Sequence, residues 1–113
     1  MAYALQFRPQ AVEQLSRLRK YDQVRIVTEC GLQLQHQPTK TSKSRIKKLE
    51  RYPGYRLRVD EFRVFYTVDE SRQEVVIHGV APKENADDWL ARYGPAMKEV
   101  EDNEAGDGSG VSS

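Results

Sequence analysis

Cysteine is almost absent from this chain of 113 residues, which contains only Cys30. A single cysteine cannot form a disulfide within the chain, so a disulfide-bonded secreted scaffold is excluded and a reducing cytoplasm is the expected location. Cys30 lies in a segment with helical spacing beside Val27 and Leu34, and no histidine forms a recognisable motif with it. We therefore interpret Cys30 as a buried structural thiol rather than a nucleophile.

Long apolar runs are also missing. No stretch approaches the roughly 18 consecutive apolar residues that a membrane-spanning helix needs. Residues 1–20 contain five charged side chains and no apolar core, so a secretory signal peptide is not expected. With 38% hydrophobic and 31% charged residues, the composition is typical of one small soluble domain.

Groups that bind metals and cofactors are scarce. The two histidines, His36 and His78, lie far apart in the sequence, and neither belongs to a cluster with metal-ligand spacing. No glycine-rich loop has the spacing that cradles a nucleotide phosphate. Neither a metal nor a cofactor is therefore expected.

Net charge is small as well, but the two signs are unevenly distributed. The chain has 18 basic and 17 acidic residues, which gives a formal charge of +1. All 18 basic residues and 12 acidic ones lie within residues 1–98, for a net +6, whereas residues 99–113 carry five acids and no base. Glycine and serine accompany these acids. We predict a folded domain over residues 1–96 and a disordered acidic tail over 97–113.

The first half of the chain is predicted to form a strand and a helical hairpin. Tyr3, Leu5 and Phe7 alternate with other residues at the period of a half-buried strand. Two segments with helical spacing follow, and Asp22 is placed to cap the N-terminus of the second helix. The apolar face predicted for that helix consists of Val24, Val27, Gly31 and Leu34.

The second half is predicted to form an antiparallel meander and a last helix. A short basic segment over 43–51 leads to a Pro53-Gly54 turn, and Trp89 lies in an amphipathic helix after Pro82. Strand-like runs cover residues 55–59, 62–69 and 74–81. The order β-α-α-β-β-β-α predicts a small α+β domain, whose mainly antiparallel sheet packs on the N-terminal helical hairpin. The crossover through that hairpin would allow the first strand to lie parallel to a neighbour.

Half of the basic residues lie between residues 40 and 63. They are Lys40, Lys43, Arg45, Lys47, Lys48, Arg51, Arg56, Arg58 and Arg63. A two-residue turn at Asp60-Glu61 would pair Arg58 with Arg63, so that Arg56, Arg58 and Arg63 project from one face of the sheet. Directly opposed like charges destabilise a sheet, whereas arginine forks match phosphate oxygens. The pattern favours a phosphate-rich partner over a solvated face whose arginines are neutralised by Glu74, Asp87 or Asp88.

Three further residues each allow two interpretations. A four-residue turn at 70–73 leaves His78 on the arginine face, and a shift of one residue moves it into the core. Trp89 either packs in the core or stacks on a nucleobase. Glu50 is either a solvated carboxylate or a general base.

These segments resemble the RelE/ParE toxin superfamily and, within it, the RelE-type ribosome-dependent messenger-RNA endonucleases. The resemblance covers about Tyr3 to Tyr93. It rests on the element order, on Lys48-Leu49 before the Pro/Gly turn, on the run from Tyr55 to Val68, and on the closing Val80-Ala81-Pro82-Lys83. It implies a RelE-like fold, which is similar to that of the microbial ribonucleases.

The resemblance also implies a function and a set of site residues. The chain would be the toxin of a type II toxin–antitoxin system, held inactive by a cognate antitoxin. It would cleave messenger RNA in the ribosomal A site by attack of the RNA 2′-hydroxyl, without a metal, while contacting ribosomal RNA. The implied catalytic residues are Arg56, Arg58, Arg63 and Lys83. The candidate RNA contacts are Lys43, Arg45, Lys47, Lys48, Arg51 and Trp89.

Two positions depart from the family pattern. Lys83 stands where the family usually has an arginine, and Trp89 stands where many RelE proteins have a tyrosine. Indole is a donor without useful acidity, so acid–base chemistry would fall to Glu50 or His78, or charge stabilisation alone would suffice. Two other functions stay open, a ParE-type toxin that binds DNA gyrase without catalysis and a non-catalytic RNA-binding module. The acidic tail is either a solubilising extension or a segment that folds over the arginine face and weakens RNA binding.

Overall fold

A five-stranded sheet forms the centre of the part of the chain that the structure describes. The computed structural model describes residues 2–108, and the side chains of residues 2–97. The strands are β1 (Ala4–Phe7), β2 (Ile46–Lys48), β3 (Tyr55–Val59), β4 (Phe62–Asp69) and β5 (Glu74–Pro82). Their order is β1-β5-β4-β3-β2, with β1 parallel to β5 and the other pairs antiparallel. The predicted α+β class is confirmed, and β2 is an additional strand within the predicted basic segment.

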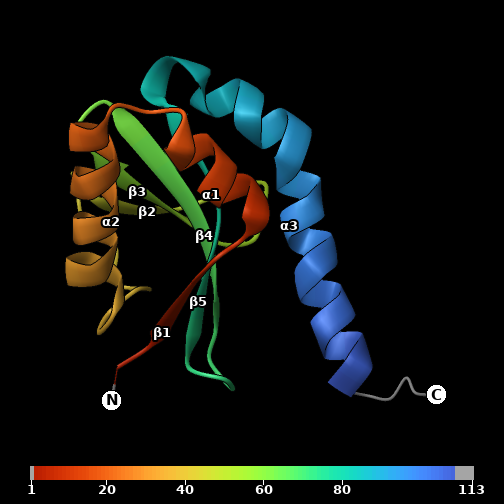
Figure 1. Ribbon diagram of the computed structural model, residues 1–113. Helices are drawn as coiled ribbons and strands as arrows, with labels where there is room; N and C mark the ends of the chain where they lie inside the picture. Colours follow the sequence, from red (N-terminus) through yellow and green to blue (C-terminus); the bar gives the residue numbers. More distant parts are fainter. Residues whose placement is uncertain (1, 109–113) are drawn as a thin grey trace.

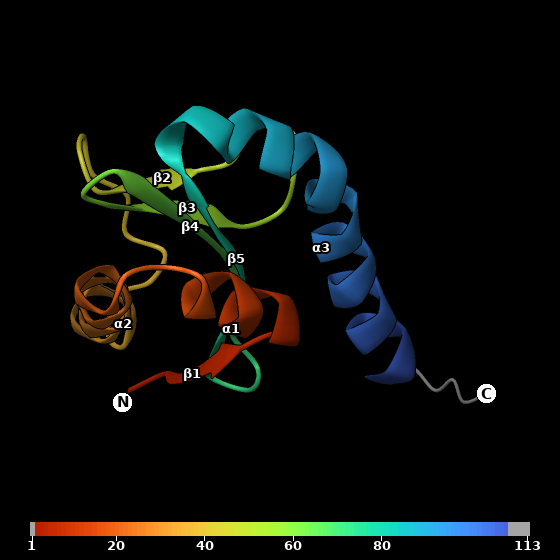
Figure 2. The same ribbon diagram turned by 45° about the horizontal axis from the view of Figure 1, so that its top comes forward.

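Helices cover both faces of this sheet. Helices α1 (Pro9–Ser16) and α2 (Lys20–Leu34) lie on one face, and α3 (Ala86–Gly108) begins over the other face (Figures 1 and 2). The short 3-10 turn η1 (Lys83–Asn85) leads from β5 into α3. None of the helices, over the described residues, is both long and apolar enough to cross a membrane. The N-terminal hairpin is therefore the layer that was predicted, whereas α3 covers part of the face that carries the arginines.

The main core lies between the sheet and the two N-terminal helices. Ile26, Cys30 and Leu34 of α2 are fully buried against strand residues such as Leu57 and Ile77. Burial raises the pKa of the Cys30 thiol to about 12, which supports its interpretation as a structural residue.

Two predictions for α2 are wrong. Val24 and Val27 are exposed, because apolar residues occur on two faces of α2 and the other one, through Ile26 and Cys30, meets the sheet. Asp22 does not cap the helix, which begins at Lys20 with Arg19 in the cap position. Asp22 instead lies in the first turn, where its carboxylate accepts a hydrogen bond of 3.2 Å from Arg19 Nε.

The predicted register of the central hairpin is confirmed. Val59 pairs with Phe62, and Arg58 pairs with Arg63, across a turn in which Asp60 has a φ of 52°. The strand entry depends on Gly54, whose φ is 102° and which lies so close to the Tyr66 carbonyl that a Cβ would collide with it.

The acidic C-terminal segment begins inside α3. The helix continues to Gly108, so its backbone is helical through most of the segment for which the sequence predicts disorder. Residues 96–101 include alanine, methionine, lysine and glutamate, which are strong helix formers. The predicted boundary between residues 96 and 97 therefore falls within a helix, and the remainder of the predicted tail, 109–113, lies outside the described residues.

Candidate nucleic-acid interface

Four cationic side chains share the sheet face opposite α1 and α2. Arg56 and Arg58 alternate with core residues on β3, and Arg63 lies across from Arg58 on β4. Strand β2 adds Lys47, because it pairs with Arg56 in the antiparallel register. We call Lys47, Arg56, Arg58 and Arg63 the basic face. The fourth cation was assigned by sequence only to a basic segment, since β2 was not predicted as a strand.

The charges of the basic face are only partly offset by carboxylates of the described residues, of which Glu61 acts on Arg63. In the part of the chain that the structure describes, Arg56, Arg58 and Arg63 form no ion pair, although Glu74, Asp87 and Asp88 were candidates to neutralise them. The pKa of Arg63 is lowered by burial of its guanidinium and then by the positive charges of Arg58 and Arg56. The face therefore holds mutually repelling cations, which an anionic ligand would stabilise.

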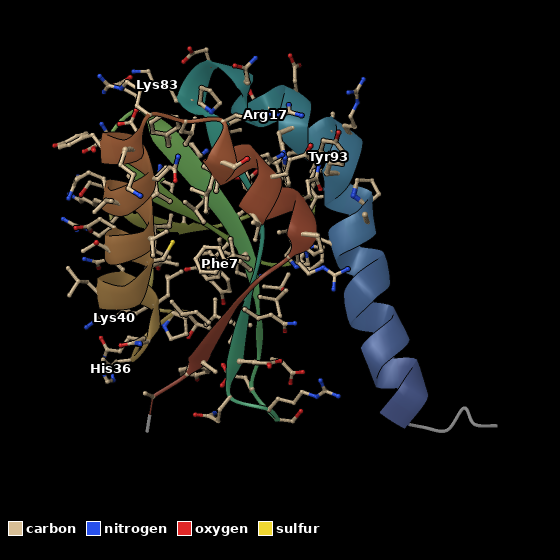
Figure 3. The ribbon with its side chains drawn as sticks, in the orientation of Figure 1. Phe7, Arg17, His36, Lys40, Lys83 and Tyr93 are labelled. Atoms are coloured by element: carbon tan, nitrogen blue, oxygen red, sulfur yellow. The ribbon has the colours of Figure 1, made fainter. Side chains whose placement is uncertain are left out.

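The acidic residues of the central hairpin form ion pairs with cations outside the basic face. Asp60 accepts two hydrogen bonds from Arg25 of α2, at 3.1 and 3.0 Å. Glu61 forms an ion pair of 3.4 Å with Lys83, which follows β5 and donates its backbone N–H to the Glu61 carbonyl. Lys83, which the resemblance implies to be catalytic, thus lies at the hairpin end of the sheet (Figure 3), with its charge offset by Glu61.

A groove adjoins the basic face between the β2–β3 connection and α3. Its volume is about 500 Å³, and its lining includes Lys47, Arg51 and Arg56 together with Glu50 and Leu90. Cationic groups and two exposed carboxylates, Glu50 and Asp87, therefore surround a cleft of a size that accepts a small organic group. Glu50 is the predicted acid–base residue that lies beside these cations.

The basic residues of the 40–51 segment do not form a single patch. Arg45 forms an ion pair of 3.4 Å with Glu29 of α2, and the Lys48 ammonium lies 5.0 Å from the centre of the Tyr55 ring. Both contacts are with the main-core side of the sheet, because Lys48 alternates with Lys47 along β2. Lys40 lies at the far end of α2 from Lys83 (Figure 3). Arg45 and Lys48 were predicted to contact RNA, but Arg45 is bound to α2, and Lys48 lines the groove while its ammonium contacts Tyr55.

Trp89 is buried and does not present its ring to a nucleobase. Its ring stacks on Phe65 at 4.7 Å between centroids and 8° between planes, within a second core under α3. Gly79, which pairs with Phe65, leaves the space for the indole, and a Cβ there would collide with the ring. The predicted base-stacking role is therefore replaced by packing. The signal that could have revealed it is a glycine inside a strand, which often marks a close approach.

His78 lies on the same side of the sheet but apart from the arginines. A β-bulge between Phe65 and Tyr66 shifts the β4–β5 register, so His78 is not paired with Phe65. The imidazole Nε2 lies 2.9 Å from the Thr67 hydroxyl oxygen, and burial, together with the charge of Arg8, lowers the pKa of His78 to about 4. Thr67 is four residues from Arg63 along β4, roughly 13 Å at the usual rise. His78 is neutral near pH 7 and too distant to act on a phosphate held by Arg63.

The family of the chain follows from sequence comparison. The sequence model of the ParE toxin of type II toxin–antitoxin systems (parDE) matches residues 5–100. The chain belongs to this toxin family. The predicted membership of the RelE/ParE toxin superfamily is confirmed, and the protein is a type II toxin. No curated protein sequence matches the chain.

Solved structures of RelE toxins share the fold of this toxin. RelE from the archaeal RelE–RelB complex of Pyrococcus horikoshii OT3 is 27% identical, with a TM-score of 0.61 over 74% of this chain and 97% of that chain. A chain of the Mycobacterium tuberculosis RelBE2 toxin–antitoxin complex is 24% identical, with a TM-score of 0.61 over 73% of this chain and 99% of that one. A mutant of E. coli RelE in the free state is 17% identical, with a TM-score of 0.64 over 89% and 98%. The predicted RelE-like fold is therefore confirmed.

Proposed function

We propose that this toxin inhibits translation by cleaving messenger RNA in the ribosomal A site, without a metal. The observation that carries the proposal is the basic face, where three arginines and a lysine, none of them in an ion pair among the described residues, adjoin a groove. Guanidinium forks match the oxygens of a phosphodiester and stabilise the charge that develops on a phosphorane. The 27% identity with an archaeal RelE chain supports the same reading.

The reaction would use the nucleophile that RNA itself carries. The 2′-oxygen forms a bond to the adjacent phosphorus, the bond to the 5′-oxygen breaks, and a cyclic phosphate and a free 5′-hydroxyl result. Arg56, Arg58 and Arg63 would orient the phosphate and stabilise its charge, with Lys83 at the edge of the site. Glu50, which lines the groove beside Arg56, would accept the 2′-hydroxyl proton, and water would protonate the leaving 5′-oxygen. The ribosome would supply much of the substrate alignment.

The proposed setting follows from the toxin family. A cognate antitoxin would hold the toxin inactive in the cytoplasm, and ribosomal RNA would form the second contact surface. Binding to RNA through Lys and Arg releases counterions, so affinity should fall steeply with added salt.

The decisive experiment is induction of the Arg63→Ala variant beside the wild type, with mapping of RNA ends on translated messages. We expect codon-phased cuts from the wild type and none from the variant, while the fold stays intact. Arg17→Ala serves as the control, because Arg17 is an exposed arginine of α1 whose partner, Glu13, lies on the same helix. Undiminished cutting by Arg63→Ala would contradict the assignment.

A second candidate function is inhibition of DNA gyrase by binding without catalysis. Two observations favour it: the matching family model is that of the ParE toxins, and the position predicted for a catalytic tyrosine holds a buried Trp89. The same induction experiment separates the two candidates. Broken or relaxed chromosomal DNA with intact messages would identify the gyrase inhibitor. Binding of RNA without new RNA ends would instead indicate a non-catalytic RNA-binding module.

A further inference from the structure

One turn of the sheet is bound from both of its sides. Asp60, between β3 and β4, adopts the left-handed backbone conformation with a φ of 52°. Its carboxylate accepts two hydrogen bonds from the Arg25 guanidinium, from Nε to Oδ2 at 3.1 Å and from Nη2 to Oδ1 at 3.0 Å. Figure 1 shows the turn between β3 and β4 beside the first turns of α2. The helix on one face thereby holds the turn that carries the arginines of the other face.

The same guanidinium continues into a short chain of ion pairs. Arg25 Nη1 lies 3.3 Å from Glu29 Oε2, and the second carboxylate oxygen of Glu29 lies 3.4 Å from Arg45 Nη1. Arg45 immediately precedes β2, which carries Lys47. The network therefore attaches α2 to both segments that supply the basic face. A lysine could not replace Arg25 fully, because an ammonium is a point charge without the fork.

Arg63 is bound to the other side of this turn. Its Nη1 donates to the Phe62 carbonyl at 2.9 Å and to the Asp60 carbonyl at 3.3 Å. Asp60 thus has two contacts of different kinds, with its carboxylate bound to α2 and its carbonyl bound to Arg63. Because Arg58 and Arg56 repel Arg63, the guanidinium needs such anchors to keep one position.

We propose that Arg25 and Asp60 are positioning residues that fix the Arg63 guanidinium for contact with an RNA phosphate. This inference rests on the function proposed above, since it takes the ligand of Arg63 to be a phosphodiester. Rates depend strongly on such alignment, because a displacement of about 1 Å can cost on the order of a hundredfold.

The first test measures cleavage of messenger RNA in a purified translation reaction by the full-length toxin. Arg25→Met, which keeps an unbranched aliphatic side chain and removes the guanidinium fork, should lower the cleavage rate about tenfold. Arg25→Lys should recover part of the loss. The matched control is Arg17→Met, which breaks the exposed Arg17–Glu13 ion pair at 3.0 Å and should leave the rate within about twofold. Equal rates for Arg25→Met and Arg17→Met would overturn the proposal.

A second measurement does not depend on activity. In the wild type, the Nε–Hε NMR signal of Arg63 should be a single resonance, and in Arg25→Met and Asp60→Asn it should shift or broaden. Asparagine tolerates the left-handed conformation, so Asp60→Asn keeps the turn while it removes the charge. An unchanged Arg63 signal in both variants would contradict the positioning role even if the toxin cleaves RNA.

A double-mutant comparison separates this role from general loss of structure. Affinity for a short single-stranded oligoribonucleotide is measured at low salt for Arg25→Met, Arg63→Ala and the double variant. If Arg25 acts through Arg63, the effect of Arg25→Met should vanish in the Arg63→Ala background, whereas independent effects would multiply and refute the proposal. If the wild type neither binds nor cleaves RNA, the proposed function and the phosphate ligand are overturned. If the Arg63 signal nevertheless shifts in Arg25→Met, Arg25 still positions the Arg63 side chain.

Discussion

The two faces of the sheet are built from the same strands but differ in what covers them and in the charge they carry. On the face under α1 and α2, alternate residues such as Leu57 and Val64 are fully buried. On the other face, α3 buries Phe65 under Trp89, whereas Arg58 is exposed and Arg56 and Arg63 are half-buried. Burial of apolar side chains on the first face stabilises the fold. The second face retains cations that repel one another and that an anionic ligand would stabilise. The contrast supports our proposal that the part of the second face that carries the arginines is the functional part.

The largest expected effect comes from the covered face. Leu57→Ala removes a fully buried side chain from β3, and its loss should lower the free energy of unfolding by about 2–5 kcal/mol. Chemical denaturation followed by circular dichroism measures the change. If Leu57→Ala lowered the free energy of unfolding by less than Leu32→Ala, a substitution of an exposed residue, the main core would not be the chief source of stability.

The second core under α3 can be tested with a pair of glycines. Gly79→Ala places a methyl group against the Trp89 ring and should destabilise the fold by about 1–3 kcal/mol. Gly31→Ala in α2 meets no atom within 4 Å and should instead stabilise by up to about 1 kcal/mol. Thermal unfolding of both variants distinguishes these signs, and equal shifts would refute the close packing of Trp89 on Gly79.

The sequence predicted best where short-range chemistry determines structure. The turn at Asp60-Glu61 and the alternation of β3 and β4 were enough to pair Arg58 with Arg63 correctly. The sequence-based prediction failed where the buried face depends on a distant partner. Helix α2 has apolar residues on two faces, and contact with the sheet buries Ile26 rather than Val27. The bulge beside His78 depends on the pairing of β4 with β5. The burial of Trp89 depends on how α3 packs on Phe65 and Gly79, which the hydrophobic periodicity of α3 alone does not predict.

His78 predicts a pH dependence that belongs to the second face. In the unfolded chain its imidazole takes up a proton near pH 6.5, whereas the folded protein keeps it neutral down to about pH 4. Protonation therefore favours the unfolded state, and stability should be lost as the pH falls from 6.5 towards 4, by about 1–2 kcal/mol at pH 5. His78→Gln should remove this component in unfolding experiments at pH 7 and pH 5. The same loss in both proteins would assign the pH dependence to other groups.

The smallest change in stability is expected from Arg58→Ala, one residue along β3 from Leu57. Arg58 is exposed and lies opposite another arginine, so its loss should alter the free energy of unfolding by no more than about 0.5 kcal/mol. Affinity for single-stranded RNA should nevertheless fall, and the slope of its logarithm against log salt should decrease by about 0.7, the value for one phosphate contact. If Arg58→Ala left RNA affinity and its salt slope unchanged, the exposed cations would be a solvated surface. Neighbouring residues on one strand would then differ only in burial, and the functional division between the two faces would not hold.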